Sequence, residues 1–166
     1  MSESGNGAGV RLGIIGLGRG FMLTLPSLLA HPDITLFAAC SSRSDARKRF
    51  EDDFGGIAYA DYDAMLGNAD VDAVYVATPH ELHMQHTLAA LAAGKCVLLE
   101  KPMAISVEQA AAIVEASKAC SKPVIVGPSH SFDPAVGEAL QLIKTGDFGK
   151  VKIVQSAYHT NFMKFV

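Results

Sequence analysis

The feature that most constrains this chain is a glycine-rich turn between a short apolar segment and a helical pattern. Residues 10–15 (VRLGII) are mostly apolar, as expected of a strand that is buried on both faces. They lead directly into residues 16–20 (GLGRG), after which Leu25, Leu28 and Leu29 recur at helical spacing. The order of strand, glycine turn and helix is typical of a site that binds phosphate groups.

The glycines of this turn have a physical purpose. They allow a positive φ angle and let the backbone come close to a pyrophosphate, while the start of the helix offers free N–H groups and a positive dipole end to the anion. The G-x-G-x-x-G spacing would place a third glycine at position 21, where this chain has Phe21. Glycines also mark ordinary turns, but the position between a buried strand and a helix favours a dinucleotide site.

The chain up to residue 126 alternates between short apolar segments and helical ones. Further strands are predicted at residues 34–40, 57–59, 73–77, 96–99 and 124–126. Helices are predicted at residues 45–54 after an N-cap at Ser44, at 61–66, at about 81–93 before Gly94, and at 106–119 with a capping box of Ser106 and Gln109. Pro26 either kinks the first helix or lies near its start after a loose turn. This alternation indicates an α/β fold, a Rossmann-type doubly wound parallel sheet.

The pattern changes after Gly127. A helix is predicted from about residue 134 to 144, ending at Gly146, and residues 150–158 alternate like a strand with one solvated face. We therefore expect three parts. Residues 1–9 form a flexible leader, residues 10–128 a dinucleotide-binding Rossmann domain, and residues 129–166 the start of a second, substrate-binding domain that is mostly absent.

Composition excludes several classes of protein. The formal net charge is -3 and there is no basic run, which argues against nucleic acid as a partner. No apolar stretch is long enough to span a bilayer, and the first nine residues do not resemble a signal peptide. The cysteines, Cys40, Cys96 and Cys120, are widely spaced and odd in number, as in a reducing compartment. We expect a cytoplasmic protein without a membrane partner.

Ligands of open α/β sheets lie beyond the carboxyl ends of the strands, and this rule selects the candidate residues. Ser41 stands where an acidic residue would bind the ribose 2′-OH of NAD and repel a 2′-phosphate. Serine removes that repulsion, and Arg43 could bind the phosphate with two N–H groups. We therefore favour NADP over NAD, although Arg43 could also be a solvated residue of its helix.

Lys101 follows the fifth strand, between Glu100 and Pro102. It could donate a hydrogen bond to a substrate hydroxyl or take part in proton transfer, and a solvated pair with Glu100 fits the pattern equally well. His80, His83 and His86 raise the question of a metal. Two of them could share an ion, but three could not without distortion, so no metal is expected.

Several motifs together resemble the glucose-fructose oxidoreductase, inositol dehydrogenase and MocA (Gfo/Idh/MocA) family of NAD(P)-dependent dehydrogenases. They are GIIGLGRGF (13–21), VYVATPHELH (74–83), VLLEKPMAIS (97–106) and IKTGDFGKV (143–151). The resemblance implies a Rossmann domain followed by a larger substrate domain, with Lys101 catalytic beside the nicotinamide and the substrate hydroxyl. The family's partner aspartate and histidine, on a helix of the second domain, are expected beyond this chain. Phe21 and the segments GLGRGFMLTLP, VYVATPHELH and GPSHSFDP look most like the branch that oxidises phthalate 4,5-cis-dihydrodiol.

The predicted function is hydride transfer between NADP or NAD and a hydroxylated substrate such as a sugar, a polyol or a cyclic cis-diol. We expect this fragment to be inactive alone and the full-length protein to be a homo-oligomer. The alternative is a module that binds NAD(P) and senses its redox state without catalysis. Lys101 is the predicted catalytic residue, and His130 and Phe132 are substrate-side candidates. The predicted cofactor-binding residues are Gly16, Leu17, Gly18, Arg19, Gly20, Phe21, Ser41, Ser42, Arg43, Ala77, Thr78, Pro79, His80, His83, Glu100, Lys101 and Pro102.

Overall fold

The computed structural model describes residues 9–127, 133–147 and 149–155 of the 166-residue chain. The chain divides into two compact units, Met1–Pro128 and Ser129–Val166. The described residues of the second unit contain one helix, α6 (Pro134–Thr145), which ends before Gly146 as predicted. Gly146 has a φ of +79°. Residues 1–8 of the expected leader lie outside the described part of the chain, and the role of residues 129–166 as the start of a substrate domain stays a prediction.

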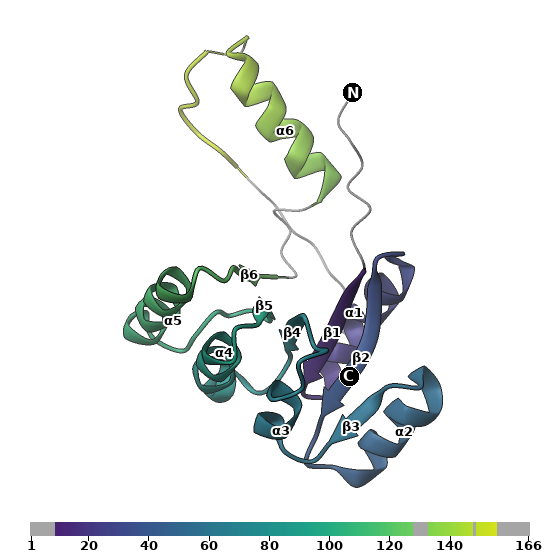
Figure 1. Ribbon diagram of the computed structural model, residues 1–166. Helices are drawn as coiled ribbons and strands as arrows, with labels where there is room; N and C mark the ends of the chain where they lie inside the picture. Colours follow the sequence, from purple (N-terminus) through teal and green to yellow (C-terminus); the bar gives the residue numbers. More distant parts are fainter. Residues whose placement is uncertain (1–8, 128–132, 148, 156–166) are drawn as a thin grey trace, which may run out of the picture. The chain divides into compact units, whose positions relative to one another are not determined.

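The first unit contains a sheet whose strands agree closely with those expected from the sequence. They are β1 (Val10–Ile15), β2 (Ile34–Cys40), β3 (Ile57–Tyr59), β4 (Ala73–Val76), β5 (Cys96–Leu99) and β6 (Val124–Val126). All pairs are parallel, in the order β3-β2-β1-β4-β5-β6 (Figure 1). The strand order reverses between β1 and β4, and such a reversal opens a ligand crevice at the carboxyl ends of the strands. The predicted Rossmann-type sheet is confirmed.

The helices that connect the strands also follow the local signals. They are α1 (Arg19–Ala30), α2 (Ser44–Phe54), α3 (Tyr62–Leu66), the 3₁₀ helix η1 (His80–Leu82), α4 (His83–Ala92) and α5 (Val107–Cys120). Ser106 Oγ accepts from the Gln109 N–H at 3.3 Å, as the predicted cap requires. Gly94, just past the end of α4, has a φ of +73°, a conformation that glycine adopts without steric cost.

Successive strand residues point to opposite faces of the sheet, and an apolar layer covers each face. Ile14 and Tyr75 belong to the apolar layer that also contains residues of α1 and α2. Ile15, Val74 and Val76 belong to the other layer, which contains residues of α3, α4 and α5. These five side chains are at most 2% exposed. This two-sided burial explains why the strands read as continuous apolar runs.

Three details differ from or narrow the expectations. Helix α1 begins at Arg19, so Pro26 lies inside it and does not mark its start. Pro26 has no N–H group to donate to the helix, but the buried side chains of Phe21 and Leu28 hold the helix on either side of it. Ser44 is not an N-cap, because α2 begins at Ser44 itself and Arg43 precedes it without a side-chain cap. Residues 150–155 do not form the expected strand, because no described segment pairs with them and a strand needs a hydrogen-bonded neighbour.

Thr87 on α4 offers a test of the packing. Its side chain is fully buried, and its Oγ1 has no hydrogen-bond partner among the described residues. Thr87→Val removes this unsatisfied group with little change of shape, so we expect the free energy of unfolding to rise by about 1–3 kcal/mol in urea titrations. The reverse change at a fully buried strand position, Val74→Thr, is the matched control and should lower it. A destabilised Thr87→Val protein would contradict the prediction.

Candidate functional site

The carboxyl ends of four neighbouring strands are level at one edge of the sheet. Ile15 of β1 is paired with Cys40 of β2 and with Val76 of β4. Val76 is in turn paired with Leu99 of β5. The segments that follow these strands are therefore adjacent. They begin at Gly16, Ser41, Ala77 and Glu100, which are all predicted site residues.

Gly16 and Gly18 are glycines for different reasons. Gly16 has a φ of +99°, and a Cβ atom there would lie 2.7 Å from the Ala77 carbonyl oxygen, so the fold itself requires glycine. A Cβ atom on Gly18 would meet nothing within 4 Å. The fold therefore does not need Gly18, and the space beside its backbone is open to a ligand.

The turn also presents unpaired donors at the start of α1. The backbone N–H groups of residues 17–20 donate to no other residue in the described ranges. The first turn of α1 carries no acidic side chain that would offset its positive dipole end. Phe21, at the position of the absent third glycine, is 3% exposed and packs edge-on against Phe54. The end of α1 can therefore bind an anion such as a pyrophosphate.

A pocket on the β2 side of the turn brings together three of the predicted segments. It is lined by Gly16, Leu17 and Gly18, by Ser41, Ser42 and Arg43, and by Ala77, Thr78 and Pro79. Tyr62, Leu82 and His86 complete much of its wall. Rings and apolar side chains beside a polar rim suit a nucleoside. Cys40 also lines this pocket, and burial raises the pKa of its thiol to about 11, so the thiol stays protonated at neutral pH.

The polar groups after β2 are partly engaged with each other. Arg43 Nη2 lies 2.7 Å from Asp45 Oδ2, and the guanidinium lowers the pKa of this exposed carboxyl. Ser41 Oγ accepts from the Arg43 N–H at 3.2 Å, and Arg47 Nη1 donates to the Ser41 carbonyl at 2.7 Å. Position 41 thus carries no carboxylate. However, Arg43, which was predicted to bind the 2′-phosphate of NADP, is already paired with Asp45.

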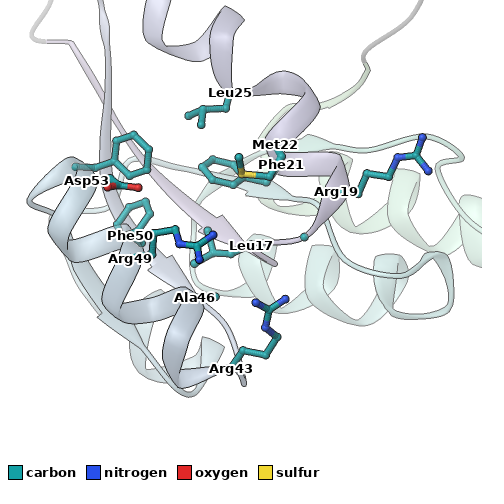
Figure 2. Close-up of a pocket in the computed structure, with 12 residues that line it drawn as sticks. Leu17, Arg19, Phe21, Met22, Leu25, Arg43, Ala46, Arg49, Phe50 and Asp53 are labelled. Carbon is teal, nitrogen blue, oxygen red and sulfur yellow. The ribbon is translucent and has the colours of Figure 1, made fainter. Parts of the chain in front are cut away.

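A second pocket lies between the glycine turn and α2 (Figure 2). Phe21, Leu25 and Phe50 give it apolar walls, and Arg43 and Arg49 bring two cations to it. Figure 2 shows Arg49 beside Leu17; Arg19 lines the pocket as well, from the start of α1. Arg49 forms no ion pair with another described residue.

Arg49 was not predicted as a site residue, because it lies in the middle of α2 and belongs to no motif. The available signal was the helical spacing of Ala46, Arg49, Phe50 and Asp53, which places these residues on one face of α2.

A third pocket lies on the β5 side of the turn and holds the other predicted residues. It is lined by Arg19, Gly20, Leu23, Thr24, Ser27, Ala77, Thr78, His80, Glu100 and Lys101. Lys101 is exposed at its edge, and Glu100 is 9% exposed. Because the glycine turn separates this pocket from the one on the β2 side, a dinucleotide with its pyrophosphate at the turn would have one nucleoside on each side.

Glu100 is fixed by two side chains that are distant in the sequence, Tyr75 and Thr24, and by the N–H of the next residue. The Tyr75 hydroxyl donates to Glu100 Oε1, and Thr24 Oγ1 lies 2.9 Å from that hydroxyl. The other carboxylate oxygen accepts from the Lys101 N–H at 3.2 Å. Burial, and then the Glu100 carboxylate, raise the pKa of Tyr75, so Tyr75 stays a donor at neutral pH. Glu100 therefore orients the backbone of Lys101 and forms no ion pair with the Lys101 ammonium. Neither Thr24 nor Tyr75 was selected from the sequence, because neither follows a strand.

The three histidines have separate surroundings. His80 is exposed and lines the β5-side pocket. His83 is fully buried, with one ring nitrogen 2.7 Å from the Pro102 carbonyl oxygen and the other 3.0 Å from the Thr78 carbonyl oxygen. His86 Nδ1 lies 3.1 Å from Thr78 Oγ1. The described residues contain no cluster of His, Cys, Asp and Glu side chains suited to a metal.

Two groups of predicted residues are not brought into these pockets. Pro102 is exposed and His83 lies beneath the surface, so neither lines any of the three pockets. His130 and Phe132 lie outside the described residues. None of the helices in the described part of the chain has the length and apolar character of a membrane span.

Comparison with known proteins agrees with this geometry. Residues 10–128 match the Gfo/Idh/MocA family, described as an oxidoreductase family with an NAD-binding Rossmann fold. A 1-carboxy-3-chloro-3,4-dihydroxycyclohexa-1,5-diene dehydrogenase of Comamonas testosteroni is 39% identical over 155 residues, which cover 93% of this chain and 39% of that protein.

Two solved structures are similar as well. The 3-ketoreductase KijD10 of Actinomadura kijaniata, in complex with NADP and TDP-benzene, has a TM-score of 0.75 and 33% identity over 83% of this chain and 43% of its own. A scyllo-inositol dehydrogenase of Lactobacillus casei has a TM-score of 0.77 and 28% identity over 85% and 43%. This chain spans about two fifths of the length of these relatives.

Gly18 allows a direct test of the phosphate site. We expect the chain to bind NADPH or NADH saturably in calorimetry, and Gly18→Val to abolish that binding because the branched side chain would occupy the open space beside the turn. The melting temperature should change little, since no atom lies near the added Cβ. Gly67→Ala, outside the turn, is the matched control and should leave binding unchanged, because its Cβ would make only ordinary contacts of 3.5 Å or more. Normal binding by a folded Gly18→Val protein would exclude the turn as a phosphate site.

Proposed function

This chain belongs to the Gfo/Idh/MocA oxidoreductase family, with an NAD-binding Rossmann fold, and on that basis we propose that it is the dinucleotide-binding part of a dehydrogenase. The reaction is hydride transfer between the nicotinamide and a hydroxylated carbon of a small substrate. The observation that carries the proposal is the glycine turn with its unpaired N–H groups between two pockets, one of which has Lys101 at its edge.

In this proposal the pyrophosphate binds at residues 16–20 and the adenosine occupies the β2-side pocket. The nicotinamide then occupies the β5-side pocket, where Lys101 and Glu100 follow β5. The bound dinucleotide supplies or accepts the hydride. The chain's own residues orient it and exclude water around the ring.

Lys101 is the proposed catalytic residue. Its ammonium can donate a hydrogen bond to the substrate oxygen, and in the amine form it would accept the hydroxyl proton as the hydride passes to the dinucleotide. The buried Glu100 supports this role, because its carboxylate accepts from the Lys101 N–H while Tyr75 holds the other oxygen. The side chain is left free to reach a ligand, since Lys101 forms no ion pair with a described carboxylate.

We favour NADP over NAD as the cofactor. The absence of a carboxylate at Ser41 supports this choice, and so do the two guanidinium groups of Arg43 and Arg49 at the pocket of Figure 2. Asp45 works against it, because it already neutralises Arg43. Arg49 has no such partner among the described residues, so we add it to the groups that bind the 2′-phosphate.

For the substrate we propose a cyclic cis-diol such as phthalate 4,5-dihydrodiol, among the broader class of sugars and polyols. The name of the Comamonas testosteroni relative describes a carboxylated and chlorinated dihydroxycyclohexadiene. In a cis-dihydrodiol that carries hydrogen on both carbinol carbons, such as phthalate 4,5-dihydrodiol, loss of a hydride and a proton gives an aromatic diol. The gain of aromaticity would draw the reaction toward oxidation.

We propose that residues 129–166 begin a second domain that supplies the remaining catalytic groups, with His130 and Phe132 on the substrate side. The full-length enzyme would be a cytoplasmic homo-oligomer without nucleic acid or membrane partners.

Cofactor choice can be tested with two arginine variants. We expect Arg43→Ala and Arg49→Ala each to weaken NADPH binding about tenfold and to leave NADH binding nearly unchanged, because only NADPH carries the 2′-phosphate. Dissociation constants for both dinucleotides are measured by calorimetry. Lys48→Ala is the control, since this exposed cation of α2 is paired with Asp52 and lines none of the three pockets. Equal losses for NADPH and NADH would show that these arginines do not bind the 2′-phosphate.

The catalytic role is tested by Lys101→Met in the full-length enzyme, which keeps the apolar stem and removes the ammonium. We expect turnover of a cis-dihydrodiol to fall about 10²–10⁴-fold, the usual contribution of a positioned acid or base. Dinucleotide affinity and melting temperature should change little. A folded variant that binds the dinucleotide and turns over within a few-fold of wild type would remove Lys101 from the mechanism and favour the redox-sensing module.

A further inference from the structure

His83 joins two segments at the edge of the site from beneath. Its ring lies between the Pro102 carbonyl oxygen, 2.7 Å from Nδ1, and the Thr78 carbonyl oxygen, 3.0 Å from Nε2. Thr78 belongs to the segment after β4, and Pro102 directly follows Lys101 after β5. One buried side chain therefore connects the segment after β4 with the segment after β5, and both of these segments line the β5-side pocket.

The chemistry of the two contacts fixes the form of the ring. A carbonyl oxygen only accepts hydrogen bonds, whereas a neutral imidazole has one N–H donor and one lone pair. A neutral ring would satisfy one carbonyl and turn its lone pair toward the other at hydrogen-bond distance. Both contacts are hydrogen bonds only when both ring nitrogens carry hydrogen. The side chain is 0% exposed, so water does not reach the ring nitrogens.

We propose that His83 is a positioning residue which, as an imidazolium, binds the carbonyls of Thr78 and Pro102 together and so fixes the backbone of Lys101. Its link to catalysis rests on the proposed role of Lys101. From the other side, Glu100 holds the Lys101 N–H. Lys101 is thus held at its own N–H and at the carbonyl of the next residue, while its ammonium stays free of ion pairs with the described residues.

No carboxylate of the described residues contacts the His83 ring, so the two carbonyl oxygens are the groups that would offset the burial of its charge. His80 on η1 packs edge-on against it, with ring centroids 5.4 Å apart. His86, one turn along α4, has its pKa lowered by burial first and by His83 second, with Asp63 of α3 acting in the opposite direction. Glu100 and Lys101 precede Pro102 in the segment after β5, and the Glu100 carboxylate accepts from the Lys101 N–H.

The protonation state can be read directly by NMR of the ring nitrogens in the 166-residue chain. At pH 7.5 an ordinary histidine, with a pKa of about 6.5, is roughly nine-tenths neutral. We expect the ¹⁵N shifts of His83 to report two protonated nitrogens at that pH. His86 in the same helix is the internal control and should report a neutral ring. A neutral His83 with a single N–H would overturn the proposal.

The positioning role is tested by hydrogen exchange of residues 100–104 in a matched set of variants. His83→Leu removes both donors, and we expect exchange there to accelerate about 10–100-fold, as for the loss of a charge-assisted bond. His83→Gln keeps an NH₂ donor and should restore part of the protection. Gln85→Ala, at an exposed position of the same helix, should leave exchange unchanged. Equal protection in all variants would overturn the role.

These measurements are separate from the proposed enzyme function. If Lys101→Met leaves turnover unchanged, the catalytic assignment fails while the NMR result for His83 is unaffected. If His83→Leu does not fold, the ring shifts of the wild-type chain and the exchange of His83→Gln still decide the proposal. In the full-length enzyme, a His83→Gln variant that retains dinucleotide affinity but loses turnover about tenfold would support it, and unchanged turnover with unchanged exchange would contradict it.

Discussion

The site depends on the close approach of two backbones at the end of β1. Gly16 adopts a positive φ, and the space where a Cβ would lie is filled by the Ala77 carbonyl at the end of β4. This contact sits at the point where the strand order reverses, so it determines how near the glycine turn comes to the segments after β4 and β5. Any side chain at position 16 would push these segments apart.

Burial on both faces of the sheet makes this arrangement rigid. The strand ends are level because the parallel register is fixed by side chains that alternate between two apolar layers, and a slip of one residue would exchange the layers. The fixed register also sets the positions of the site residues. Gly16, Ser41, Ala77 and Glu100 are each the first residue after a strand, so their positions follow from the register rather than from flexible loops.

Around that frame, buried polar groups hold the ligand-facing ones. Tyr75 and Thr24 fix Glu100, and His83 fixes the carbonyls of Thr78 and Pro102. The Tyr75–Glu100 bond is buried and the others are partly buried, and in such surroundings an unpaired partner is costly and a satisfied one is well ordered. At the β2 side the polar groups are exposed, and Arg43 is shared with Asp45. The two ends of the crevice therefore differ, with a rigid β5 side and an adaptable β2 side.

The sequence by itself determined the order of helices and strands, the glycine turn and the strand-end residues, because apolar periodicity, glycine and capping signals act over a few neighbouring residues. It did not determine what depends on distant partners. Residues 150–155 alternate like a strand but form none without a paired neighbour among the described residues. Tyr75 and Glu100 are 25 residues apart, and His83 and Pro102 are 19 apart. Only the tertiary structure could place Arg49 at the pocket and His83 beneath Lys101, because a helix pattern gives the face of a side chain but not what that face meets.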